Sequence, residues 1–219
     1  MQTVAVISQK GGSGKTTLAL HLAVASQAAG RNTAVIDLDP QASAAKWSDR
    51  RENDVPVVLS AHASRLSNEM ERARKAECDI LLLDTAPHSD SAALEATKLA
   101  ELVLIPCRPA ILDMEAISNT LDLVRTQSTP VCVVMNAVAP QGNEAREAAE
   151  AIAELDAPVC SVHLVNRVAF SRSLITGQTA QEFEPDGKAA QEALRLHEFM
   201  CAHLNNFTDE HGGSNTGVQ

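Results

Sequence analysis

Short apolar runs alternate with longer amphipathic segments along this chain. The apolar runs predict buried strands at residues 4–7, 34–36, 80–83, 102–105 and 131–135, with a weaker strand at 56–59. The spacing of apolar positions between these runs predicts helices over about residues 15–29, 65–76, 112–126, 144–155 and 187–204. Gly30 is well placed to end the first of these helices in a left-handed conformation.

Strands that alternate with helices of this length indicate an α/β fold. Connections of a dozen or more residues let consecutive strands run parallel, and helices then cover both faces of the sheet. We therefore predict a mostly parallel, twisted sheet with helices on both faces. No linker rich in proline, glycine or serine divides the chain, so residues 1–205 are expected to form one domain. Residues 206–219 are expected to form a polar, disordered tail.

Composition narrows the class of protein further. Apolar residues make up 45% of the 219 residues and charged residues 21%, which is typical of a globular protein. Five cysteines without a Cys-x-x-Cys pair favour reduced thiols over a zinc site or a disulfide framework. There is neither a signal-like N-terminus nor an apolar stretch of membrane-spanning length. We therefore expect a cytoplasmic protein that does not insert into a membrane.

Charge argues against a general affinity for polyanions. The formal net charge is −10, and a dimer of this chain would carry about −20, so most of the surface would repel nucleic acid. The charge is uneven, however: residues 1–76 carry 10 basic and 7 acidic side chains, whereas residues 77–219 carry 8 and 21. Any contact with DNA therefore needs a concentrated basic surface.

The strongest chemical signal is the run Lys10-Gly11-Gly12-Ser13-Gly14-Lys15-Thr16-Thr17, which links the first strand to the first helix. Glycines let backbone N–H groups point inward around a phosphate, and the helix N-terminus adds partial positive charge. In this pattern Lys15 neutralises the β- and γ-phosphates and the Thr16 hydroxyl binds Mg²⁺. Gln9 occupies the first glycine position of the standard phosphate-loop pattern, so that pattern is not met in full.

Two acidic strand ends support a nucleotide site. Asp39 follows the second predicted strand and Asp84 ends the strand at 80–83. Carboxylates at the carboxyl ends of parallel strands face the same crevice as the phosphate loop, where they can hold Mg²⁺, usually through water. Thr16, Asp39 and Asp84 are thus the candidate metal-binding residues.

The run with two lysines resembles the deviant Walker A box of the ParA/MinD group of P-loop ATPases, and the resemblance extends over about residues 2–204. It implies a P-loop NTPase that binds ATP, ADP and Mg²⁺. It also implies that Lys10 reaches the partner's phosphates in an ATP-dependent homodimer and that Asp39 orients the attacking water. Asp84 then lies near the Mg²⁺ shell, and Asn136, at a strand end, falls where relatives contact adenine.

Within this group the chain is most similar to short plasmid-type ParA proteins. The segment Asp39-Pro40-Gln41-Ala42-Ser43, followed by Trp47, carries that similarity. No helix-turn-helix segment precedes the first strand and no basic amphipathic helix ends the chain, which favours DNA partition over septum positioning. The resemblance implies non-specific DNA and a centromere-binding ParB-type protein as partners. It also implies residence on the nucleoid in the ATP state. No arginine finger or catalytic glutamine is evident in the sequence, so we expect slow hydrolysis that DNA and a partner protein accelerate.

Two alternatives remain open. A related ATPase that positions a non-DNA cargo would use the same switch, and a P-loop amide ligase or synthetase would share the phosphate loop. Stimulation of hydrolysis by a small metabolite, rather than by DNA and a protein partner, would favour the ligase. The candidate DNA-binding residues form two groups, which are Arg50, Arg51, Arg65, Arg72, Arg74 and Lys75, and Arg167, Arg172, Lys188 and Arg195.

Overall fold

The computed structural model describes the backbone of residues 1–212 and the side chains of residues 1–110 and 113–205. Its strands form one parallel sheet in the order β3-β2-β4-β1-β5-β6. The prediction of a parallel α/β sheet is therefore confirmed. The strands are β1 (Gln2–Val6), β2 (Thr33–Asp37), β3 (Val57–Ser60), β4 (Ile80–Asp84), β5 (Leu102–Cys107) and β6 (Val131–Met135).

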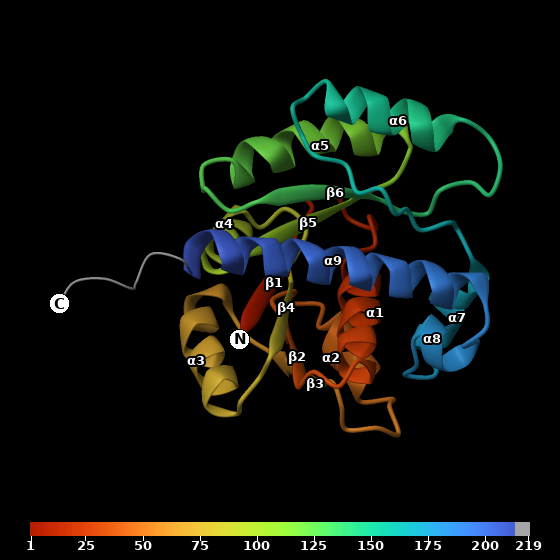
Figure 1. Cartoon of the computed structure of the whole chain (residues 1–219). Helices are drawn as coiled ribbons and strands as arrows, with labels where there is room; N and C mark the ends of the chain where they lie inside the picture. Colours follow the sequence, from red (N-terminus) through yellow and green to blue (C-terminus); the bar gives the residue numbers. More distant parts are fainter. Residues whose placement is uncertain (213–219) are drawn as a thin grey trace.

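Helices connect the strands and cover both faces of the sheet (Figure 1). One face is packed by the first two helices and the last three, the other by the four between them. The first set is α1 (Lys15–Ala28), α2 (Ser43–Ser48), α7 (Val168–Ile175), α8 (Ala180–Phe183) and α9 (Lys188–Gly212). The second set is α3 (Leu66–Lys75), α4 (Asp90–Leu99), α5 (Ile111–Val124) and α6 (Glu144–Ala153), with a short 3₁₀ turn η1 (Ala63–Arg65) before α3.

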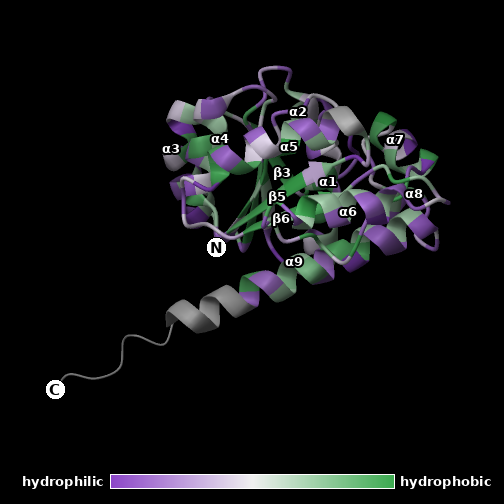
Figure 2. Ribbon diagram, turned by 90° about the horizontal axis from the view of Figure 1, so that it is seen from above, coloured by the Kyte–Doolittle hydropathy of each residue, from purple (hydrophilic) through white to green (hydrophobic). Residues whose placement is uncertain are grey.

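The core lies on the two faces of the sheet because neighbouring strand residues point to opposite sides. Leu82 packs with the helices of the first set and Leu83 with those of the second, and both are fully buried. A strand buried on both faces has to be apolar throughout, as the central strands are (Figure 2). Trp47, the only tryptophan, is 1% exposed in the first of these cores.

Differences from the predicted elements lie mainly where apolar periodicity is weak. The six strands and the five predicted helices are present with small shifts at their ends, and Gly30 follows α1 in the left-handed region. The prediction missed α2, α4, α7 and α8, of which α8 has only four residues. The expected tail from residue 206 is wrong in part, because α9 continues to Gly212 and no glycine or proline interrupts residues 205–211. Residues 213–219 of that tail lie outside the described residues.

The cysteines are free thiols, four of them buried, as the spacing of the cysteines predicts. Within the described residues, no group of three or more His, Cys, Asp or Glu side chains is arranged to hold a metal ion. None of the helices described has the length and apolar character needed to cross a membrane. The phosphate-loop run and the acidic residues singled out in the sequence lie at the carboxyl edge of the sheet, where β1, β2 and β4 end.

Candidate nucleotide site

The loop between β1 and α1 has a backbone that glycine permits and other residues resist. Gly12 and Gly14 have φ values of 75° and 100°, both in the left-handed region. A Cβ atom at Gly14 would lie 2.1 Å from Nδ2 of Asn136, so that position also lacks room for a side chain. α1 begins directly after Gly14, so its free N–H groups face the loop. The local geometry is that of a phosphate-binding loop.

Lys15 is buried at the first position of α1, with 6% of the residue exposed. Its Nζ donates a hydrogen bond to the Lys10 carbonyl oxygen at 3.2 Å. Burial lowers the pKa of Lys15, and the nearby carboxylates of Asp84 and Asp39 oppose that change. No carboxylate among the described residues forms an ion pair with it. The Lys15 ammonium group is thus available to an anionic ligand.

Asp84 ends β4 and is completely buried. Neither carboxylate oxygen, nor the buried Ser13 hydroxyl, has a hydrogen-bond partner among the described residues. Burial raises the pKa of Asp84 to about 7, while the nearby Thr16 hydroxyl and Lys15 ammonium oppose the rise. Buried polar atoms without partners are rare in folded proteins and are typical of a ligand-binding site. Their chemistry fits a Mg²⁺ ion with its water shell and a phosphate group.

Asp37 is a residue that the sequence analysis passed over. It ends β2 beside Asp84 of β4 and is 1% exposed. Its Oδ1 accepts the backbone N–H of Asp39 at 3.0 Å, while its Oδ2 accepts those of Ala44 and Ala45 at 2.9 and 3.2 Å. Burial raises the pKa of Asp37, and these three N–H donors oppose the rise. Asp37 therefore holds the Asp39 loop and the start of α2; the motif Asp37-Leu38-Asp39 was the signal that could have indicated it.

Asp39 is only partly buried and lies close enough to Lys15 to affect its pKa. Its Oδ1 accepts the Gln41 N–H at 2.8 Å. Asp39 also lines a cavity of about 440 Å³ between its own loop, His62 and the loop after β4. A carboxylate at the wall of such a cavity can contact water, so the geometry is compatible with the water-orienting role implied by the resemblance.

Asn136 and Lys10 have different surroundings near the phosphate loop. Asn136 follows β6 and its Nδ2 donates to the Ser13 carbonyl oxygen at 2.6 Å, so its amide supports the loop directly. Its predicted contact with adenine stays a prediction. Lys10 lines a second cavity of about 500 Å³ with His88 and Asp122. That cavity lies at the surface, as a contact with a partner protomer requires.

The ten candidate DNA-binding residues differ in whether an acidic residue pairs with them. Arg51 and Arg167 are engaged by Glu182 and Glu192 in ion pairs of 2.7 Å. On α3, three cations pair with acidic residues of the same helix: Arg72 with Glu69, and Arg74 and Lys75 with Glu71. Arg172, Lys188 and Arg195 are exposed and have no ion pair among the described residues. We call these three residues the α7–α9 basic surface.

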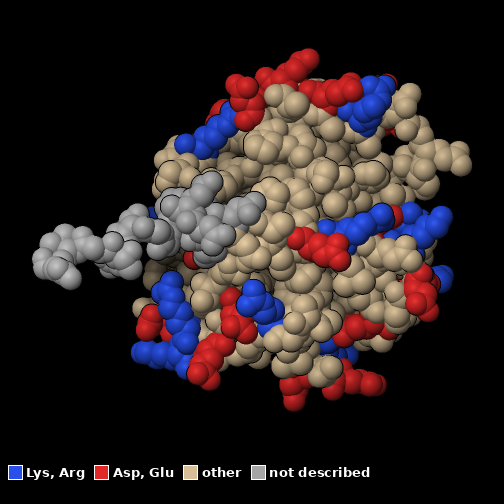
Figure 3. Space-filling view, in the orientation of Figure 1, with Lys and Arg blue, Asp and Glu red and all other residues tan. Residues whose placement is uncertain are grey.

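Arg172 and Lys188 line one hollow of about 390 Å³, and Arg195 lies two turns further along α9. Figure 3 shows basic side chains, mixed with a few acidic ones, gathered near α7 and the start of α9 at the right of the view. Arg50 and Arg65 are also exposed, but Arg50 donates to the Leu174 carbonyl oxygen at 3.2 Å. The second group of candidates thus contains the more concentrated surface.

A parallel sheet with a glycine-rich loop before α1 and acidic residues at the adjoining strand ends, one of them buried without a partner, defines a P-loop NTPase. The family model for the CobQ/CobB/MinD/ParA nucleotide binding domain matches residues 4–180, and the chain belongs to this family. The resemblance to the ParA/MinD group of P-loop ATPases is thereby confirmed.

Curated relatives of similar length carry two kinds of name. The chain is 32% identical over 196 residues to "Maintenance of carboxysome distribution protein A" of Gloeobacter kilaueensis, with 88% of each chain covered. It is 26% identical to the protein of that name in Halothiobacillus neapolitanus, covering 88% of this chain and 92% of the relative. Identity to "Protein ParA" of Rhizobium radiobacter is also 26%, covering 78% of this chain and 81% of the relative.

Solved structures with nucleotide show the same fold. MinD of Pyrococcus horikoshii with Mg-ADP has a TM-score of 0.74 and 17% identity, covering 99% of both chains. An Asp-to-Ala variant of Cyanothece McdA with ATP has a TM-score of 0.67 and 15% identity, covering 100% of this chain and 99% of the other. Together with the unpartnered atoms around Asp84, these complexes support ATP or ADP and Mg²⁺ as the ligands of this site.

Proposed function

We propose that this chain is an ATPase whose ATP-bound homodimer resides on DNA and positions a cargo, and that hydrolysis to ADP and phosphate resets it. One observation carries the proposal: Lys15, Asp39 and Asp84 lie at one edge of the sheet, close enough for their charges to interact. Lys15 also donates a hydrogen bond to the Lys10 carbonyl oxygen. A buried lysine beside acidic residues at two neighbouring strand ends suits phosphate binding followed by attack of water.

Each side chain has a distinct part in this mechanism. Lys15 and the N–H groups at the start of α1 hold the phosphates, and the Thr16 hydroxyl and Asp84 hold the metal shell. When bound, Mg²⁺ neutralises charge on the phosphate oxygens. Asp39 orients the attacking water. Lys10 of each protomer crosses to the phosphates of the other, which makes nucleotide binding and dimerisation one linked equilibrium.

Variants of these residues separate binding, dimerisation and turnover. Lys15→Ala is expected to abolish ATP binding, and Lys10→Ala to keep ADP binding but lose the ATP-dependent dimer. Asp39→Ala is expected to bind ATP and dimerise without releasing phosphate. Lys98→Ala, an exposed lysine on α4, is the matched control. Light scattering with a slowly hydrolysed ATP analogue measures the dimer. If Lys10→Ala forms as much dimer as wild type, Lys10 does not make the proposed contact with the partner's phosphates.

We further propose that the α7–α9 basic surface contacts DNA phosphates. This proposal is supported by the three exposed cations of that surface, which have no ion pair among the described residues. The chain as a whole is acidic, so most of its surface is unfavourable for DNA binding. Such binding has no sequence preference and weakens steeply with salt. It would retain the ATP-bound dimer on nucleoid DNA and release it when the dimer opens.

A gel shift with ATP tests this surface against a matched one. The triple variant Arg172→Ala, Lys188→Ala and Arg195→Ala should weaken binding and reduce the dependence of log K on log salt by about three per protomer. The control triple variant replaces the paired cations of α3: Arg72→Ala, Arg74→Ala and Lys75→Ala. If the control loses DNA binding and the first variant keeps it, the contact lies on α3.

Two cargoes are compatible with this switch. Partition of a replicon through a centromere-binding ParB-type protein is supported by the Asp39-to-Trp47 motif and the ParA relative. Positioning of a protein assembly is favoured by the two relatives named for carboxysome distribution, which match the larger share of this chain. That observation gives protein cargo at least equal weight, although the sequence motifs favoured partition.

Deletion of the gene in its own cells distinguishes the two cargoes. Loss of a replicon at division would support partition, whereas a protein assembly that becomes misplaced while replicons are inherited normally would support cargo positioning. No contact among the described residues favours the ligase alternative. ATP turnover that requires a small metabolite and is unaffected by DNA would support the ligase.

A further inference from the structure

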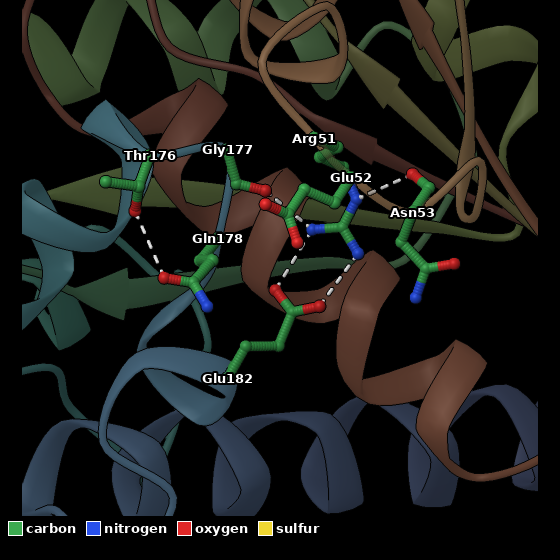
Figure 4. A pocket seen from close by; sticks show the side chains of 7 residues that line it. All are labelled: Arg51, Glu52, Asn53, Thr176, Gly177, Gln178 and Glu182. Atoms are coloured by element: carbon green, nitrogen blue, oxygen red, sulfur yellow. Dashed lines mark hydrogen bonds and ion pairs between the residues drawn. The ribbon is translucent and has the colours of Figure 1, made fainter.

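The segment that follows α2 is held by a buried arginine. The Arg51 side chain is 3% exposed, and its Nη1 and Nη2 donate to the two Glu182 carboxylate oxygens at 3.0 and 2.7 Å. The same guanidinium donates to the carbonyl oxygens of Gly177, Val55 and Asn53 at 2.8, 2.9 and 3.3 Å. Figure 4 shows Arg51 and Glu182 facing each other, Arg51 from the segment after α2 and Glu182 from α8. This arginine joins two segments that are 131 residues apart in sequence.

Further contacts join α2 and the segment after it to the turn between α7 and α8. The Trp47 indole Nε1–H donates to the Gln178 carbonyl oxygen at 3.0 Å, and the Arg51 guanidinium lies 4.5 Å above the Trp47 ring. The backbone of Gly177 approaches Arg50 so closely that a Cβ at Gly177 would lie 2.5 Å from the Arg50 carbonyl carbon. Side chains and backbone together therefore fix α2 against the turn between α7 and α8.

That turn is itself attached to the helix of the phosphate loop. The Ala180 N–H donates to His21 Nε2 on α1 at 3.0 Å, and Gln181 Nε2 donates to the His21 carbonyl oxygen at 2.9 Å. At its other end, α2 is joined to Asp39 through Asp37, which accepts N–H groups from both. Asp39 thus lies in a loop anchored by Asp37 on one side and by Arg51 on the other.

We propose that Arg51 and Glu182 are positioning residues for ATP hydrolysis: their ion pair holds α2 in place and so keeps Asp39 at a fixed location relative to the phosphate loop. This rests on the proposed role of Asp39 in orienting water. Neither side chain reaches the nucleotide in this role; each acts through the loop. Release of one anchor lets Asp39 move without altering Lys15 or Thr16, so turnover falls while ATP binding stays.

Two conservative substitutions test the pair. Glu182→Gln keeps the size of the side chain and removes its charge, and Arg51→Lys keeps the charge and removes the planar two-point contact. Both are expected to lower kcat by about tenfold and to change KM for ATP by less than about twofold, since a displaced catalytic group affects turnover more than binding. The control is Arg146→Gln, which breaks an exposed ion pair of the same 2.7 Å length on α6.

Trp47 supplies a second readout because it is the only tryptophan. In Glu182→Gln its emission should shift to longer wavelength, since the ring loses part of its enclosure. The double variant Arg51→Gln with Glu182→Gln should have about the kcat of Arg51→Gln alone, because Arg51→Gln already removes the ion pair that Glu182→Gln breaks.

The possible outcomes separate this proposal from the proposed function. Wild-type protein without ATP turnover refutes the proposed function itself. Normal wild-type turnover with unchanged kcat in both conservative variants refutes the positioning role, as does a rise in KM that matches the fall in kcat. If Arg51→Lys does not fold, Glu182→Gln and its emission shift still decide the question.

Discussion

His21 provides the sharpest test of the packing between the phosphate-loop helix and α8. The ring is enclosed, with Nδ1 lying 2.7 Å from the Thr17 carbonyl oxygen and Nε2 accepting the Ala180 N–H at 3.0 Å. A ring that accepts at Nε2 carries its proton on Nδ1, so the neutral tautomer satisfies both contacts. Protonation at Nε2 would set two donors against each other.

Burial lowers the pKa of His21 from 6.5 to about 4, although the Thr17 carbonyl and the Glu182 carboxylate oppose the change. Above pH 6.5 the ring is neutral in both the folded and the unfolded chain, and its contribution to stability is complete. As the pH falls below 6.5 the unfolded chain binds the proton first. The free energy of unfolding then falls by about 2 kcal/mol at pH 5 and about 3 kcal/mol at pH 4.

Urea unfolding from pH 7.5 to 4.5, with wild type and His21→Gln side by side, measures this contribution. His21→Gln should be less stable at pH 7.5, because glutamine does not reproduce both contacts, and the gap should narrow by about 2 kcal/mol at pH 5. His163→Gln, at an exposed position, controls for removal of a histidine as such. Unfolding free energies of wild type and His21→Gln that run parallel with pH would show that His21 titrates equally in both states, and would refute the reasoning.

Three further substitutions test other contacts. Gly177→Ala should lower the free energy of unfolding by about 1–3 kcal/mol more than Gly30→Ala, because both have positive φ but only Gly177 has backbone in the way; equal urea midpoints would contradict the close approach. Gly14→Ala should weaken ATP binding at least about tenfold by displacing Asn136, and an unchanged calorimetric Kd would argue against it. Leu82→Ala should lower the free energy of unfolding by about 3 kcal/mol, since this side chain of β4 is fully buried. A decrease below about 1 kcal/mol in urea unfolding would show that the core closes around the smaller side chain.

The candidate site was largely predictable because its signals are local in sequence. The glycines from Gly11 to Gly14 stand between an apolar run and a helical pattern, and the acidic groups directly follow apolar runs. Parallel topology then brings strand ends together at one edge without further information. Asp37 was missed because its motif contains two acids, and only burial distinguishes the one that holds the loop from the one left accessible.

Basic residues were the least predictable class. Arg51 and Arg167 have the same local sequence character as exposed arginines, yet both pair with acidic residues of distant segments. Sequence spacing carries no information on a contact across 131 residues, whereas local signals such as the Thr179–Glu182 capping box are visible in principle.

Amino-acid order alone determined the alternation of strand and helix, the phosphate loop and the acidic strand ends, because these depend on hydrophobic periodicity and on residue types a few positions apart. Only the tertiary structure decided which cations stay at the surface, that Asn136 supports the Ser13 carbonyl, and that Arg51 anchors the Asp39 loop to α8. Those outcomes depend on burial and on distances between segments remote in sequence, and folding alone sets both.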